Sequence, residues 1–202
     1  MKYPLFYDKV ESITLYDPLA EFLGSFEQGK ITFSYLQIVQ FSGHSCPTVA
    51  GAYLMTLKAL QALYPDSLPV RGEIRVEFKE HLEDGVAGVI STVISNITGA
   101  TDKSGFKGLG GKFARHSLMN FEADILANAR FTRTDSNKTV DVFYNPSVVS
   151  ASPDMQPLMQ KMMQKNANEK EKKLFGTLWQ SRVEEILTNY ENYSKLIKVE
   201  VL

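Results

Sequence analysis

The sequence predicts an α+β fold, in which a mixed or antiparallel sheet packs with helices and a helical part lies at the C-terminus. Apolar residues recur at helical spacing over residues 46–63, and charged and apolar side chains alternate over residues 70–81 as in a half-buried strand. Three further strand-like segments precede two helix-like ones. We therefore expect a core domain over residues 1–150 and a helical extension, packed on that core, over residues 151–202.

Local signals define the elements of the first half. Asp17 and Pro18 are typical of an N-cap and a first helical position, and Gly29 ends the short helix that they begin. Residues 30–41 are rich in β-branched and aromatic side chains, so they form either a strand or a buried helix. Periodicity does not decide between the two.

The second half begins with a nearly uncharged segment that we expect to be a central, buried helix, with Asp84 as its N-cap and Gly99 at its end. A glycine-rich loop, GATDKSGFKGLGGK over residues 99–112, follows. Beyond it, the patterns predict strands over residues 112–121, 128–134 and 139–144, a helix from Ser152, a longer helix ending near Tyr190, and a last strand over residues 196–202.

The composition narrows the class of protein. With 44% hydrophobic and 22% charged residues the chain can build a core, and a formal net charge of -1 without a basic stripe argues against nucleic acid as a partner. No apolar stretch approaches the roughly 18 residues of a membrane span, and the N-terminus lacks a signal-peptide pattern, so we expect a cytoplasmic protein. The single cysteine excludes an internal disulfide.

The segment FSGHSCPTVAG carries the clearest chemical signal. Cys46 is placed at the start of the helix over residues 46–63, where unpaired backbone N–H groups and the helix dipole favour the thiolate. His44 lies two residues earlier. A thiolate binds metal ions or attacks carbon, and a nearby imidazole can serve as a second ligand or as a base.

Two ligands are too few for a zinc site, which takes three or four from the protein. His81, at the end of the strand over residues 70–81, would be the third and would leave one position open. Plainer interpretations remain: a lone cysteine is often a buried small hydrophobe, and a strand-end histidine is often a surface residue. His116 is interpreted as structural.

The glycine-rich loop is not a Walker A motif, because Phe106 stands where its first glycine belongs and Phe113 where its Ser or Thr belongs. We interpret residues 100–111 as a loop that is mobile without ligand and borders a cleft at His44 and Cys46, with a plain surface turn as the alternative. If it covers a cleft, it brings polar side chains to a polar or anionic small-molecule ligand, and the predicted substrate-binding residues are Asp102, Lys107 and Lys112.

The stretch FSGHSCPTVAGAYLM resembles the FmdE family, which takes its name from formylmethanofuran dehydrogenase. The G-H-x-C-P motif of that family is complete here, from Gly43 to Pro47. Its second motif is matched more loosely by the helix that Asp84 opens and by the segment TGAT at its end, and the similarity extends over residues 33–121. The resemblance implies an α+β core, a homodimer, and a metal site around His44 and Cys46.

Two departures from the family pattern bear on the site. Ala100 replaces the cysteine of the second motif, so any role of that sulfur is lost. His81 lies near a position where many members have a cysteine, which keeps a metal-binding residue type there. Together with the motif, this favours a site of His44, Cys46 and His81, for which zinc is the best-suited ion and nickel or iron are further candidates.

The sequence therefore predicts a metal-binding FmdE-like protein, either a metal-dependent enzyme acting on a small molecule or an accessory subunit of a larger one. The alternative is a metal-free enzyme in which Cys46 is the nucleophile and His44 or His81 is the base.

Overall fold

The computed structural model describes residues 2–193 and 195–202 and confirms the predicted α+β fold. The larger sheet has the strand order β4-β3-β5-β6-β7, with β3 parallel to β4 and the other neighbours antiparallel. A separate antiparallel hairpin is formed by β1 and β2. The strands are β1 (Ile13–Tyr16), β2 (Lys30–Phe33), β3 (Ile74–Glu77), β4 (Met119–Asn120), β5 (Ala129–Arg133), β6 (Thr139–Tyr144) and β7 (Ile197–Val201).

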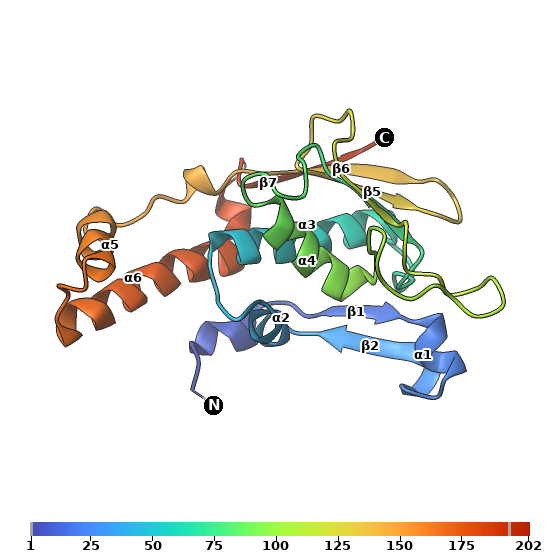
Figure 1. Cartoon of the computed structure of the whole chain (residues 1–202), viewed down its shortest axis with the longest axis horizontal. Helices are drawn as coiled ribbons and strands as arrows, with labels where there is room; N and C mark the ends of the chain where they lie inside the picture. Colours follow the sequence, from blue (N-terminus) through green and yellow to red (C-terminus); the bar gives the residue numbers. More distant parts are fainter. Residues whose placement is uncertain (1, 194) are drawn as a thin grey trace.

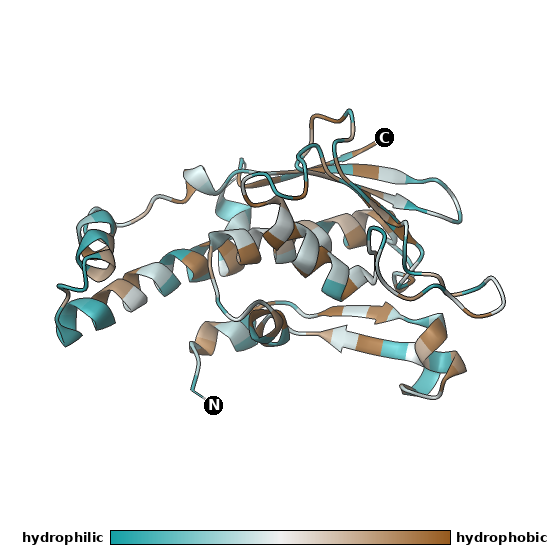
Figure 2. Cartoon of the chain, viewed as in Figure 1, coloured by the Kyte–Doolittle hydropathy of each residue, from teal (hydrophilic) through white to brown (hydrophobic). Residues whose placement is uncertain are grey.

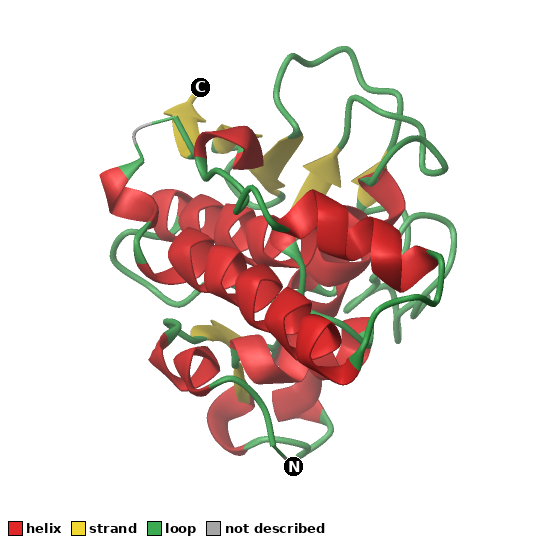
Figure 3. Ribbon diagram, turned by 90° about the vertical axis from the view of Figure 1, so that its left-hand side faces the viewer, coloured by secondary structure: helices red, strands yellow, loops and turns green. Residues whose placement is uncertain are grey.

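Helices α3 (Pro47–Leu63) and α4 (Ala87–Thr98) fill the layer between the larger sheet and the hairpin (Figure 1). Seen from the side, the helical layer again separates the sheet strands from the hairpin (Figure 3). Hydrophobic residues recur along α3, where most side chains are buried, whereas the far end of α6 is hydrophilic (Figure 2). The core of the protein therefore lies around α3.

The helix expected to be central, α4, lies in the central layer but is buried on one face only, and the helix buried on all sides is α3. Side chains on every face of α3 are buried, because the larger sheet, α2, α4 and α6 surround it. Helix α4 is amphipathic, and Val89 on its outer face is 37% exposed. Asp84 does not cap α4, which begins after Val86 without a side-chain cap, but Gly99 ends it in the left-handed conformation as predicted.

Residues 30–41, for which the sequence predicts either a strand or a buried helix, contain one of each. Strand β2 ends at Phe33, and α2 (Tyr35–Ser42) begins two residues later. Ser34 and Gln37 form a capping box there, which separates the strand from the helix. Helix α1 (Pro18–Phe22) begins at its predicted N-cap, Asp17.

The strand predicted over residues 112–121 is wrong except for the two residues of β4. Phe113 has φ 63° and Ser117 has φ 59°, so the backbone turns twice before β4 begins. Left-handed φ values are incompatible with an extended strand. The sequence carries no glycine at either position to signal these turns.

The C-terminal residues pack on the core. Helix α5 (Met155–Met163) contacts α6 (Glu169–Thr188), and α6 packs along α3. Strand β7 pairs with β6 and extends the larger sheet, so residues 151–202 supply a strand of the core as well as helices. Among the residues described, no helix has both the length and the apolar character required to cross a bilayer.

Candidate functional site

The G-H-x-C-P motif forms the connection between α2 and α3 (Figure 1). Gly43 ends α2 with φ 73°, a left-handed conformation that glycine adopts without strain. Cys46 is the N-cap of α3, and its Sγ accepts a hydrogen bond from the Val49 N–H at 3.4 Å. Pro47 occupies the first helical position. The half-buried thiol is therefore held at the positive end of a long helix, as predicted.

His44 is exposed and has a defined tautomer. Its Nδ1 lies 3.0 Å from the Ser42 carbonyl oxygen, which can only accept, so Nδ1–H donates, and in the neutral ring Nε2 is the nitrogen with the free lone pair. Metal-binding histidines commonly donate one ring N–H to a backbone carbonyl, which orients the other nitrogen for the ion. The contacts of His44 and Cys46 thus go to the backbone rather than to each other.

Two side chains of α6 hold the connection between α2 and α3 in place. The Ser45 carbonyl accepts hydrogen bonds from Trp179 Nε1 at 3.0 Å and from Gln180 Nε2 at 3.2 Å. The Ser45 hydroxyl lies 2.8 Å from the hydroxyl of buried Tyr35. Burial raises the pKa of Tyr35, so its hydroxyl stays protonated at neutral pH. These contacts hold the backbone between His44 and Cys46 in one shape.

Strand β6 fixes the start of α3. The Tyr144 hydroxyl donates to the Pro47 carbonyl at 2.7 Å, and its ring lies against Gly51. A Cβ at Gly51 would come within 2.1 Å of that ring. Burial raises the pKa of Tyr144 well above its ordinary value and keeps it a donor. Gly51 therefore permits the close approach that anchors the motif to the sheet.

His81 has the opposite tautomer. It is exposed in the turn after β3, and its Nδ1 accepts a hydrogen bond from the Glu83 N–H at 3.2 Å. The neutral ring therefore carries its proton on Nε2. Binding an ion through Nε2 would require a change of tautomer and loss of this hydrogen bond.

No group of three or more His, Cys, Asp or Glu side chains is placed to hold a metal ion within the described part of one chain. His44, Cys46 and His81 are thus not gathered into the three-ligand site that the sequence predicts. The pair His44 and Cys46 still has the donor atoms and the tautomer of a metal site. The assignment of all three residues as ligands stays a prediction.

The predicted substrate-binding residues do not share one cleft. Lys112 lines a cavity of about 270 Å³ beside α1, Asp102 lines a second hollow beside α4, and Lys107 is exposed. The glycine loop lies next to α1, away from the connection between α2 and α3 (Figure 1). Within one chain it therefore covers a different cavity from the one expected. Its predicted mobility stays a prediction.

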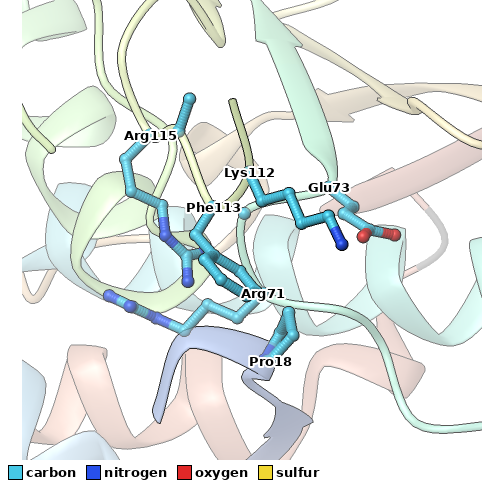
Figure 4. A pocket seen from close by; sticks show the side chains of 8 residues that line it. Pro18, Arg71, Glu73, Lys112, Phe113 and Arg115 are labelled. Carbon is cyan, nitrogen blue, oxygen red and sulfur yellow. The ribbon is translucent and has the colours of Figure 1, made fainter. Parts of the chain in front are cut away.

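The Lys112 cavity is lined by two arginines that the sequence analysis did not single out (Figure 4). Arg71 Nη1 lies 3.1 Å from Asp17 Oδ2, and Arg115 Nη2 lies 2.7 Å from Asp17 Oδ1. Arg71 also donates to the Asn96 and Ile97 carbonyls at the end of α4. Asp17 thus joins two segments from far along the chain, which its predicted role as an N-cap did not indicate.

Comparison with protein families matches residues 41–194 to the family described as "FmdE, Molybdenum formylmethanofuran dehydrogenase operon". The match covers well over half of the chain, including the motif, the glycine loop and α6. A search of curated proteins found no match.

Proposed function

Because the chain belongs to the FmdE family, we propose that it binds one transition-metal ion through His44 Nε2 and Cys46 Sγ. The observation that carries the proposal is the pairing of an N-cap thiol with an exposed imidazole whose Nδ1 is already bonded to a backbone carbonyl. The N-cap position holds the sulfur at the start of α3, and the bonded Nδ1 leaves Nε2 as the ring nitrogen available to an ion.

Zinc is the ion that best suits one thiolate and one imidazole, and nickel or iron would also accept this ligand set. A further protein ligand is needed. His81 is our candidate, after a change of tautomer, from the same chain or from a second copy. An ion with an open position would supply Lewis-acid chemistry and a bound water of lowered pKa.

The surrounding residues position the ligands. Trp179 and Gln180 hold the Ser45 carbonyl, and Tyr144 holds the Pro47 carbonyl, so the backbone on both sides of Cys46 is fixed. Fixed ligands lower the ordering cost of binding an ion.

We propose a cytoplasmic protein that acts on a small molecule at this site, as an enzyme or as an accessory subunit, without nucleic acid as a partner.

The second candidate function is a metal-free enzyme with Cys46 as nucleophile. It requires a base within hydrogen-bond reach of the sulfur. Among the described residues Cys46 Sγ accepts from the Val49 N–H, and no hydrogen bond joins it to an imidazole nitrogen, so no base is in contact with the thiol. The geometry therefore favours the ligand role over the nucleophile role.

Elemental analysis of the metal content of protein purified without a polyhistidine tag tests the proposal. We expect about one ion per chain in the wild type, and affinity reduced about 100-fold or more in Cys46→Ala and His44→Ala, because each variant removes a ligand. His116→Ala, a half-buried histidine outside the motif, is the control and should keep its metal. Full occupancy in both motif variants would refute the assignment, and unchanged affinity in His81→Ala would remove only that residue.

We also propose that the protein is a homodimer, as the resemblance to the family implies. The methionines of α5 differ in solvent exposure: Met155 is buried in its own chain, whereas Met163 is 80% exposed. Exposed apolar side chains of this kind are common at interfaces. Light scattering should give twice the chain mass, and Met163→Lys should weaken the dimer while Leu5→Lys, equally exposed on the N-terminal segment, should not. A one-chain mass at micromolar concentration would contradict the dimer.

A further inference from the structure

The cavity beside α1 is an independent candidate for ligand binding. It has a volume of about 270 Å³ and is lined by Pro18, Arg71, Gly72, Glu73, Lys112, Phe113, Ala114 and Arg115. Its walls come from α1, from the segment before β3 and from the end of the glycine loop (Figure 4). The volume lies just under the roughly 300 Å³ at which small-molecule sites begin. A ligand, or the part of it that enters, is therefore small.

The charges at the cavity do not balance. Arg71, Arg115 and Lys112 carry positive charge, and Asp17 and Glu73 carry negative charge, so one positive charge is in excess. The Lys112 ammonium and the Glu73 carboxylate face one another in Figure 4, but neither has an ion-pair partner among the described residues. The excess positive charge lies at the cavity, which all of these charged side chains except that of Asp17 line. Such a site attracts an anion.

Arg115 has hydrogen-bonding capacity that the protein does not use. The residue is 5% exposed, and Asp17 accepts from its Nη2. Its Nη1 is buried without a hydrogen-bond partner. A buried charged donor left unpaired is strongly unfavourable, so a partner from outside the chain would be stabilising.

The backbone around Arg115 is shaped to admit the guanidinium. A Cβ at Gly72 would lie 1.7 Å from Nη1, so any residue but glycine would displace it. Phe113 and Ser117, on either side in sequence, both have left-handed φ values, and the Phe113 ring packs on Phe22. Nη1 is therefore placed against Gly72, which lines the same cavity as Arg115.

We propose that this cavity binds an oxyanion group, a phosphate or a carboxylate, through the Arg115 guanidinium and the Lys112 ammonium. Arg71 is a positioning residue, because it acts on Arg115 through the shared carboxylate of Asp17. A guanidinium presents paired donors that match the oxygens of either group. The metal ligands His44, Cys46 and His81 do not line this cavity, so the two proposals are independent.

Titration with inorganic phosphate and, separately, with acetate tests the proposal. Binding is followed by calorimetry and by the rise in Tm, at constant ionic strength with chloride as the balancing anion. Saturable binding of phosphate alone, acetate alone or both supports the site and identifies the chemical class that it prefers. Failure of both to bind saturably would overturn the proposal.

Variants of the glycine loop and of Arg115 locate the binding. Lys112→Gln should weaken the preferred anion about fivefold or more, whereas Lys107→Gln, exposed in the same loop and outside the cavity, should leave it unchanged. Arg115→Lys keeps the charge but loses the paired donors and should weaken binding about tenfold or more. Equal affinity in Lys112→Gln and Lys107→Gln would overturn the site even if Arg115→Lys fails to fold.

Discussion

Replacing Asp17 by asparagine is expected to lower the free energy of unfolding by about 3 kcal/mol at neutral pH, because it leaves two arginines without their counter-ion. The Asp17 carboxylate accepts hydrogen bonds from Arg71, Arg115 and the N–H groups of Leu19 and Ala20. Asparagine keeps the shape and can still cap α1. The measured difference therefore reports the charge.

A matched control separates this effect from a general cost of losing a carboxylate. Asp135 pairs with Arg133 at the surface, so Asp135→Asn should cost at most about 1 kcal/mol. Urea unfolding in chloride buffer measures both variants, because phosphate would itself stabilise the arginines if it binds there. If Asp17→Asn costs no more than Asp135→Asn, the buried arginines do not depend on the carboxylate.

The pH dependence of this difference has a defined sign. Burial alone would raise the pKa of Asp17, but the charge of Arg115 and the hydrogen bonds from Ala20 and Arg71 outweigh it, so the pKa is lowered. A lowered folded-state pKa gives stability that is fully present above the unfolded pKa of about 3.9 and is lost as pH falls through the folded value. The difference between wild type and Asp17→Asn should therefore shrink below about pH 4.

The parts of the fold that the sequence predicted correctly are those with a local signal. Asp17 before Pro18, Cys46 before Pro47 and Gly99 after an apolar run each mark a helix boundary through the backbone groups that the helix end leaves unpaired. Such signals act within a few residues. They do not depend on contacts with distant segments, which is why they could be identified without the structure.

The errors have a common physical origin in contacts between distant segments. Asp84 is a good cap by residue type, yet α4 starts at Ala87. Phe113 and Ser117 adopt left-handed conformations without glycine while Arg115, between them, reaches Asp17. The distance in sequence between Asp17, Arg71 and Arg115 hid their cluster, since it forms only when the start of α1, the segment before β3 and the residues after the glycine loop pack together.

In the candidate metal site, too, the sequence predicts what a local signal determines and not what depends on distant segments. The motif fixes Cys46 at a helix start and His44 beside it, because both positions follow from local backbone geometry. A third ligand depends on how the turn after β3 is arranged, or on a second copy of the chain. Sequence spacing carries no information on either, so the placement of His81 could not be derived.

Alkylation of Cys46 should separate the ligand role from the nucleophile role. We expect iodoacetamide to react slowly with the metal-loaded protein and much faster after chelation, because a bound ion occupies the sulfur lone pair. With metal at about ten times its Kd, the fraction of free thiol falls about tenfold, and the labelling rate should fall with it. Cys46 is half-buried and the only cysteine, so mass spectrometry follows a single reaction.

His44→Ala supplies the control, since it keeps the thiol and the helix start but removes a ligand. Its labelling rate should match that of the chelated wild type whether or not metal is present. Restored protection on adding metal back to the wild type, and not to His44→Ala, would assign the effect to the ion. Equally fast labelling with and without chelator would show a free thiol and favour the nucleophile. Equally slow labelling in both would mean that packing alone shields Cys46, and that the Sγ contact with Val49 only caps α3.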